Sequence, residues 1–498
     1  MKTLFLLIAL AYSLSCLSQD VKTTLSTANH FIAAKQLARA DSVLAAYNRA
    51  HTNAYVLQLH AQVMYWKQDY PAALDMYEKA LTLFPDSMFL HLDYGRFLFH
   101  TGKLSTAERQ LLRVTSSDKT HAEANMMLAQ LASWKGNVAK ATAHLRHLRE
   151  AYPTNNSIAA LAKEICSVSA PFVRVAYDYL SDDQPLTGSQ ATLDAGFTQS
   201  SYFAPHLSAN GFQYTSGNII SKGGLFKIGN TFRFGYGSTT IRADGGMFMP
   251  AGTATFIGSA ELTQKLSRNV NVQLGTARLP YQYTVSSLRQ PFAYGLTTAA
   301  LNYNRKDKIL GKAAIEVQGF DDGNMVYTGY SWLLLPVIHQ AKLKLKSGYS
   351  FSYADSRINL FSSKVSLPVL AATQPFSTSI GGVYQTVFTP RKQAVHSLLL
   401  SSSVDISNVF QLSLTGSLGL SASADNPVLI LEKNAAGQAI INKYYYKQKY
   451  TPVELSAILK TQLSPGVSLN TKYTYSSLFF YTRNNFNLQL NYLFLHGK

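Results

Sequence analysis

The 498-residue chain has little cysteine, few charged residues and no long apolar run. Its two cysteines exclude a disulfide-stapled scaffold and a cysteine-rich zinc module. Charged residues make up only 14% of the chain, a low share for a soluble protein. Because no apolar run reaches the length of about 18 residues needed to span a bilayer, a helical membrane protein is excluded as well.

The residues that are abundant point elsewhere. Hydrophobic residues make up 47% of the chain, which excludes wholesale disorder. There are 30 tyrosines and 26 phenylalanines, and the formal net charge is +18. A weakly charged, tyrosine-rich chain is typical of an outer-membrane β-barrel, and the length favours two domains.

The first 18 residues have the pattern of a secretory signal peptide. A basic start at Lys2 is followed by an apolar core over 4–12 and by small residues, so we expect cleavage after Ser18. Cys16 allows a second interpretation, a lipoprotein cleavage box, although Ser13 stands where such a box usually has leucine. If Cys16 leaves with the signal, Cys166 is the only cysteine of the mature chain and has the character of a small buried residue.

Residues 19–165 repeat with a period of 34. Three columns of residues coincide at this shift, two of small side chains and one of large ones. They are Ala61, Gly95 and Ala129; Ala73, Ala107 and Ala141; and Tyr77, Leu111 and Leu145. Pro85 and Pro153 close two of the units. The period and the columns resemble the tetratricopeptide repeat, which implies helix pairs stacked into a solenoid.

The repeat pattern also predicts details of this solenoid. Glycine turns at Thr101-Gly102-Lys103 and Lys135-Gly136-Asn137 should join the two helices of a unit, and Thr27–Asn53 reads as a degenerate first unit. Such arrays present protein-binding surfaces, so we expect a periplasmic protein partner. His144 and His147 lie three residues apart on one helix, a spacing that could suit a metal ion. Because no carboxylate or cysteine ligand accompanies them, we expect a solvated helix face instead.

After a linker at 166–172, the period changes from 3.6 to two. Apolar and polar residues alternate over 341–353, 410–420 and 486–494, in stretches of barrel-strand length. At about 20 residues per strand and connection, residues 173–498 predict an antiparallel transmembrane β-barrel of about 16 strands, with 12 or 14 also possible. The expected fold class is thus α + β, an α-solenoid followed by a barrel.

Two further features of the barrel region can be placed from the sequence. We expect outer loops at Asp182–Thr187, Phe320–Asn324, Leu367–Pro375 and Asp425–Asn442. The last strand resembles the aromatic-rich signal read by barrel-assembly machinery, although four residues follow its final aromatic. Its residues are Phe486, Leu488, Leu490, Tyr492 and Phe494.

Most of the positive charge belongs to the barrel region. Residues 1–170 hold 17 basic and 12 acidic residues, which leaves 28 basic and 15 acidic residues for the rest. Lys342, Lys344 and Lys346 alternate with apolar residues, so they should line the pore together and attract anions. The alternative is that such cations contact lipopolysaccharide phosphates or the periplasmic rim.

We find no group of residues in the sequence with the arrangement of a catalytic site. The barrel region has four histidines, His206, His339, His396 and His496, and none lies in a nucleophile motif such as G-x-S-x-G. Asp321-Asp322-Gly323-Asn324 lacks the spacing of a calcium loop and reads as a turn. We therefore expect no enzyme activity, no cofactor, no metal site and no nucleic-acid partner.

A signal peptide, tetratricopeptide repeats and a C-terminal barrel together resemble two groups of outer-membrane proteins. One comprises the exporters of bacterial exopolysaccharides such as poly-N-acetylglucosamine and cellulose. The other is the YaiO-like family, whose shorter repeat array is closer to this chain. The resemblance implies an outer-membrane location, with the repeats in the periplasm. It also implies a pore for a polysaccharide or other anionic solute, or alternatively a non-transporting anchor whose repeats recruit partners.

Overall fold

The structure is a computed structural model that describes residues 20–183, 186–250, 253–282, 284–306, 308–384, 387–478 and 482–495. The expected signal peptide at 1–18, including Cys16, lies outside the described residues. The chain divides into two compact units, Met1–Ile165 and Cys166–Lys498. Each unit is described by itself.

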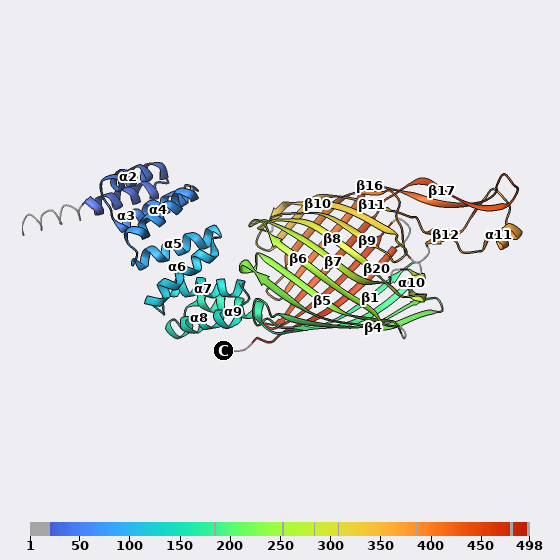
Figure 1. Cartoon of the computed structure of the whole chain (residues 1–498), viewed down its shortest axis with the longest axis horizontal. Helices are drawn as coiled ribbons and strands as arrows, with labels where there is room; N and C mark the ends of the chain where they lie inside the picture. The colour runs from blue at the N-terminus through green and yellow to red at the C-terminus, as the bar shows by residue number, and fades with distance from the viewer. Residues whose placement is uncertain are drawn as a thin grey trace, which may run out of the picture. The chain divides into compact units, whose positions relative to one another are not determined.

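The N-terminal unit consists of helices throughout its described residues (Figure 1). A helix over 20–33 precedes the elements α2 Leu37–Ala50, α3 Ala54–Trp66, α4 Tyr70–Leu83, α5 Met88–Thr101, α6 Leu104–Ser117, α7 Ala122–Trp134, α8 Val138–Ala151 and α9 Asn156–Ser169. Among the described residues, no helix is both long and apolar enough to cross a membrane.

Local sequence signals set the helix boundaries. The Asn53 side chain caps α3 by accepting from the backbone N–H of Tyr55, and Asp69 caps α4 through the N–H of Ala72. Gly102 ends α5 in the left-handed conformation, at φ +84°, where glycine carries no steric penalty. The two predicted glycine turns are therefore present.

The small-residue columns lie where paired helices cross. Ala61, Ala73, Ala107, Ala129 and Ala141 are all fully buried, and Gly95 is buried beside Leu111. A Cβ on Gly95 would lie 3.0 Å from Leu111 Cδ2. The columns thus mark close helix contacts, as the repeat resemblance implies.

The linker expected at 166–172 is shorter than predicted. Helix α9 continues to Ser169, and its buried residues Ile158, Ala162 and Ile165 pack with the last repeat. Strand β1 begins at Phe172, directly after Pro171. Proline cannot continue a helix, so the change of structure is confined to the two residues before β1.

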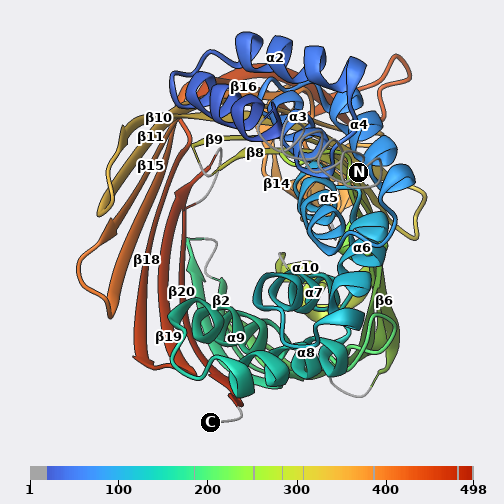
Figure 2. The same ribbon diagram turned by 90° about the vertical axis from the view of Figure 1, so that its left-hand side faces the viewer.

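The second unit is a closed antiparallel barrel of 16 strands, which confirms the predicted fold class (Figures 1 and 2). The strands are β1 Phe172–Asp182, β2 Leu186–Gly196, β3 Pro205–Ser216, β4 Ile219–Phe234, β5 Thr239–Pro250, β6 Thr255–Lys265, β7 Val270–Tyr281, β8 Phe292–Arg305, β9 Ile309–Gly319, β10 Met325–His339, β11 Leu343–Ser356, β15 Gln393–Asp405, β16 Phe410–Lys433, β18 Val453–Ser464, β19 Val467–Ser477 and β20 Thr482–Leu493.

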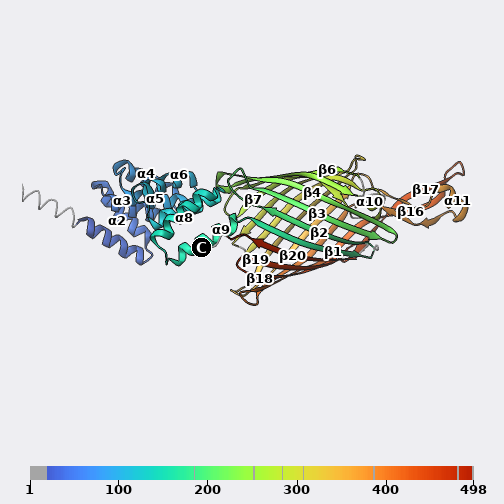
Figure 3. The same cartoon turned by 90° about the horizontal axis from the view of Figure 1, so that it is seen from below.

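Pairing between the first and last strands closes the barrel. Strand β20 runs antiparallel to β1 from Phe172 opposite Leu493 to Asp182 opposite Arg483, and the two lie side by side in Figure 3. The predicted assembly strand is β20, and Phe494 follows it with its N–H donating to the carbonyl of Pro171 at 2.9 Å. No sheet edge is left open along this seam.

The two faces of the barrel wall differ sharply in polarity. On one face, apolar side chains are exposed all around the barrel, at 37–61% of their surface. These include Val175, Leu193, Phe226, Ile228, Leu274, Leu301, Ile315, Leu333, Leu398, Leu414, Leu455 and Leu488. A continuous exposed apolar band on a closed barrel is the surface that lipid covers.

The rim where β1 ends, here called the far rim, carries the long connections. The segment 357–392 joins β11 to β15 and contains β12 Phe361–Ser363, α11 Leu367–Thr373, β13 Thr378–Ile380 and β14 Gly382–Tyr384. The segment joining β7 to β8 contains α10 Val285–Arg289. At the opposite, near rim, the 3-10 turn η1 Gly235–Gly237 joins β4 to β5.

The prediction of an outer loop at Asp425–Asn442 is wrong. Strand β16 continues through it to Lys433 and turns back as β17 Ala439–Tyr450, forming a hairpin beyond the barrel wall (Figure 1). Pro427 is tolerated there because β16 has only β17 beside it between Ser423, its last pair with β15, and Leu429, its first pair with β13.

Candidate functional site

The inner wall of the barrel is polar, and part of it is basic. Register places Lys344 and Lys346 of β11 on the face shared with Ser350 and Ser352, which line a cavity inside the far rim. Lys460 of β18 and Lys472 of β19 share this inward face with Glu454, which lines the same cavity. We call Lys344, Lys346, Lys460 and Lys472 the lysine wall.

A row of paired residues connects the lysines across the strands. Lys344 lies opposite Ser403, which lies opposite Ser413, then Ile458 and then Lys472. With strands about 4.8 Å apart, this row spans roughly 19 Å. The lysine wall is thus one surface, with the hydroxyl groups of two serines and the side chain of Ile458 between Lys344 and Lys472.

Lys342 lies at the near-rim end of this surface, outside strand β11. It lies in the near-rim turn between β10 and β11, where its carbonyl accepts from the N–H of Asp405 at 2.9 Å. Strand β11 begins one residue later, at Leu343. Only Lys344 and Lys346 of the three predicted lysines therefore lie within a strand.

Several other inward-facing cations are paired with carboxylates. Arg174 Nη1 lies 3.7 Å from Asp194, Lys227 Nζ lies 3.5 Å from Asp244, and Arg483 Nη2 lies 3.5 Å from Asp182. Among the described residues, none of the lysine-wall ammonium groups forms an ion pair. The lysine wall thus brings four inward ammonium groups without ion pairs together on β11, β18 and β19.

Few carboxylates oppose the lysine wall on its own side. Within the barrel wall, and excluding the β16–β17 hairpin, the described parts of β11 to β20 have two inward-facing acidic side chains, Glu454 toward the far rim and Asp405 at the near rim. Asp405 accepts a hydrogen bond from Gln411 Nε2 at 2.7 Å. A cation-rich, acid-poor stripe in a confined lumen attracts anions.

The cavity inside the far rim has a volume of about 1360 Å³. Strand residues such as Gln318, Thr328 and Gln393 form part of its lining, and the segment 357–392 contributes others, including Tyr384 and Phe388. Its lining includes both polar and aromatic side chains. A cavity of this size accommodates several sugar units or a comparable organic anion.

Two segments at the far rim fold toward this cavity. Val387 packs with Tyr281, Tyr294, Phe320 and Val326 in a buried cluster, and the N–H of Phe388 donates to the hydroxyl of Tyr281 at 3.1 Å. Helix α10 contacts β4, although β4 is not a neighbour of β7 or β8. Both segments therefore narrow the lumen at this rim.

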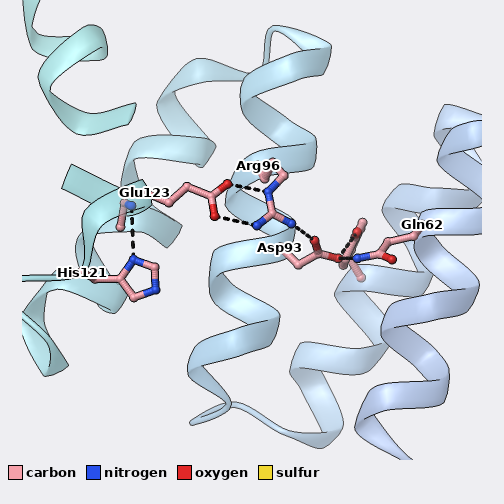
Figure 4. A network of polar contacts seen from close by, with 7 residues as sticks. Gln62, Asp93, Arg96, His121 and Glu123 are labelled. Atoms are coloured by element: carbon pink, nitrogen blue, oxygen red, sulfur yellow. Dashed lines mark hydrogen bonds and ion pairs between the residues drawn. The ribbon is translucent and has the colours of Figure 1, made fainter. Parts of the chain in front are cut away.

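The repeat unit contains one extended polar network (Figure 4). Asp93, 3% exposed, accepts from Gln62 Nε2 at 2.8 Å, from the Tyr77 hydroxyl at 2.6 Å and from Arg96 Nη1 at 2.6 Å. Arg96 also donates from Nε and Nη2 to the two carboxylate oxygens of Glu123, at 2.6 and 2.7 Å. The network joins α3, α4, α5 and α7.

Ionisation in the network follows from these contacts. Hydrogen bonds from Arg96 hold the pKa of Glu123 below its usual value, although burial opposes this, and the same bonds raise the pKa of Arg96. Burial and the neighbouring Asp93 carboxylate raise the pKa of Tyr77. The guanidinium thus compensates two carboxylates, one of them buried.

The remaining predicted residues have structural surroundings. His144 Nδ1 lies 2.9 Å from Asn125 Oδ1, and its pKa is lowered by burial and then by the neighbouring His147. In the described part of the chain, no group of three or more His, Cys, Asp or Glu side chains could hold a metal ion. Phe486, Leu488, Leu490 and Tyr492 lie on the exposed apolar face of β20. Cys166 is a free, half-buried thiol in α9.

Comparison with known proteins supports the repeat assignment. A family model described as tetratricopeptide repeat matches residues 67–131. No curated protein shows significant sequence similarity to the chain.

Several solved structures share parts of the fold. A bacterial polysaccharide outer membrane secretin is 9% identical, with a TM-score of 0.47, over 66% of this chain and 99% of that one. A loop-deletion mutant of OmpT, an outer membrane protein of Vibrio cholerae, is 9% identical, with a TM-score of 0.31, over 65% and 97%. A tetratricopeptide repeat protein from Parabacteroides merdae is 15% identical, with a TM-score of 0.28, over 30% and 60%.

Sequence reasoning missed two parts of the candidate site. Lys460 and Lys472 lie in alternating stretches, but only the register of β16, β18 and β19 brings them to the wall that carries Lys344. The Arg96 network left a partial signal, because Gln62, Arg96 and Gln130 occupy one position of the 34-residue repeat. This polar column recurs with the same period as the small-residue columns.

Proposed function

We propose that this chain is an outer-membrane pore that passes a polysaccharide or another anionic solute, and whose repeats bind a periplasmic protein. The lysine wall is the observation that supports passage of anions. It consists of unpaired cations inside a closed barrel whose outer face is apolar. Ion-selective pores are lined by rings or stripes of one charge sign in this way.

Charge reversal in the lysine wall tests the proposal. The full chain, inserted in a planar bilayer, should give anion-selective conductance, and the K344E/K346E variant should lose that selectivity or become cation-selective. K342E is the matched control, because Lys342 lies in the near-rim turn two residues upstream and should change selectivity much less. Selectivity unchanged in K344E/K346E contradicts the proposed role of the lysine wall.

A second candidate function is favoured by the far-rim segments. Val387 and α10 fold toward the lumen, as expected of a plugged barrel that anchors the repeats without transport. A correctly folded, heat-modifiable barrel that gives no conductance would support this anchor function. In either case, the repeats are the part of the chain that we propose to bind partner proteins.

A further inference from the structure

The β16–β17 hairpin has two unlike faces. On one face, Leu429 and Leu431 are buried against Leu370 and Ile380 of the segment 357–392. On the same side, Arg391 stacks over the Tyr445 ring at 3.7 Å, and Lys443 Nζ donates to the Asn359 carbonyl at 2.7 Å. This face is occupied by the protein itself.

The other face is open and carries tyrosines, amides and a carboxylate. Tyr444 and Tyr446 are each 47% exposed and lie two residues apart on β17, so both rings point to one side of the sheet. We call this surface the exit face. Its polar and aromatic residues are Asn426, Glu432, Asn442, Tyr444, Tyr446 and Gln448, and Val428, Ile430 and Ile440 lie between them on the same face.

The exit face is continuous with the lumen. Asn426 and Tyr450 both line the far-rim cavity. The pairing of β16 with β17 has no register shift from Ala422 opposite Tyr450 to Asn426 opposite Tyr446, so these residues share a face. A chain leaving the cavity along this wall meets Gln448, Tyr446 and Tyr444 in turn.

Hydrogen bonds hold the two tyrosine rings in place. Asn426 Nδ2 lies 2.5 Å from the Tyr446 hydroxyl and 3.2 Å from Gln448 Oε1. The Tyr444 hydroxyl donates to Glu432 at 3.0 Å, and Asn442 Nδ2 donates to the same carboxylate at 2.5 Å. Each ring therefore has a fixed edge and a free face, with side-chain amides beside it.

This arrangement has the chemistry of a sugar-binding surface. The C–H face of a pyranose ring packs on an exposed aromatic ring, while its hydroxyls bond to amides and carboxylates at the ring's edge. Rings two residues apart on a strand rise about 6.6 Å, which is of the order of one sugar unit. Tyrosines of a lipid-facing girdle would lie instead on the outward face, as Tyr177 and Tyr179 of β1 do.

We propose that the exit face binds successive pyranose rings of a saccharide chain, each packed on Tyr446 or Tyr444, as the chain leaves the barrel. This inference rests on the proposed pore function and assigns sugar-ring contacts to a named surface outside the far rim. The exit face recognises the sugar ring, whereas the lysine wall recognises charge.

Two hexasaccharides that differ only in charge test the assignment. The full chain in detergent is titrated with cellohexaose and with a hexamer of β-1,4-linked glucuronic acid. The Y444A/Y446A variant should bind both at least tenfold more weakly than the natural sequence, whereas Y444F/Y446F should stay within about threefold because it keeps the rings. Y177A/Y179A, with the same spacing on the lipid face, is the matched control and should bind normally.

The possible outcomes separate this inference from the pore itself. Failure of the natural protein to bind either hexamer, or equal binding by Y444A/Y446A, overturns the saccharide assignment. Anion-selective conductance would then still support a pore, but one that passes a solute other than a saccharide. Conversely, hexamer binding by a silent barrel supports the exit face and contradicts the pore. Heat-modifiable migration confirms that each variant barrel has folded.

Discussion

Arg96 shows how one residue fixes the stacking of the repeats. Its guanidinium pairs with Asp93 in its own helix and with Glu123 in the next repeat. The Asp93 side chain is only 4% exposed, whereas Arg96 and Glu123 are 36% and 39% exposed. The buried carboxylate would be costly without its partners, so the network specifies the register between repeats more than it adds stability.

Acid should weaken this junction through Glu123. Arg96 keeps the pKa of Glu123 in the folded state below the unfolded value of 4.5. Its stabilisation is therefore complete above pH 4.5 and is lost as pH falls through the lower folded value. Because Glu123 is partly exposed, we expect about 1 kcal/mol or less.

Urea unfolding, followed by helical circular dichroism at pH 7 and pH 3, measures this effect. E123Q should lower the urea midpoint relative to the natural sequence at pH 7, and the two midpoints should converge at pH 3. E150Q, which changes a carboxylate outside the network, is the control. A difference between E123Q and the natural sequence that stays constant with pH would falsify the role given to the Arg96–Glu123 pair.

At the scale of single strands, β20 carries the clearest division between lipid and lumen. Leu488 and Gln489 are adjacent in sequence and point to opposite faces of the wall. Leu488 is 39% exposed on the apolar face, and Gln489 donates to Asn491 at 2.7 Å on the inner face. The strand therefore offers a matched pair of sites.

L488R and Q489R should differ in the stability of the barrel. Arginine on the lipid face costs about 2–4 kcal/mol near the bilayer midplane, whereas arginine on a polar inner face remains hydrated. L488R should lower the urea midpoint of unfolding from vesicles, and Q489R should leave it nearly unchanged. Equal midpoints for the two variants would show that this face of β20 does not contact lipid.

The elements differ in how far the sequence could predict them. Alternation over 410–420 and 486–494 was enough to predict strands of the right kind, because each strand's outer face is set by lipid alone. The hairpin was missed because Asp425-Asn426-Pro427 resembles a turn. Only the absence of a second neighbour beside Pro427 lets β16 continue. The alternation of side chains along a strand depends on the surroundings of that strand alone. Which strands lie beside it depends on the whole sheet, so the alternation could not predict the hairpin.

At the scale of the molecule, the same limit separates the predicted lysines from the observed wall. Lys344 and Lys346 were identifiable from one strand's alternation, but Lys460 and Lys472 join them only through barrel closure and register. The paired cations, such as Arg174 with Asp194, could not be separated from the unpaired ones by composition. Net charge shows which unit of the chain is basic, whereas strand topology decides where the cations without ion pairs gather in that unit.

The segment 357–392 narrows the lumen of the barrel at the far rim. It contributes Tyr384 and Phe388 to the far-rim cavity, and Val387 holds it against the inner-wall cluster of Tyr281 and Val326. Its ends lie close together, because Ala354 of β11 is paired with Gln393 of β15. A short glycine-serine turn can therefore replace residues 358–391 without pulling the strands apart.

Such a replacement should raise single-channel conductance while preserving anion selectivity. The reason is that the lysine wall lies on strands the deletion leaves intact, whereas the narrowing at the far rim is removed. Planar-bilayer recording compares the deletion variant with the full chain. Replacing the hairpin tip 434–438 with glycine and serine residues is the control, since this turn lies at the end of the hairpin distant from the barrel wall. Equal conductance in the deletion variant and the full chain would mean that the segment does not narrow the pathway, and the constriction would then be sought at α10.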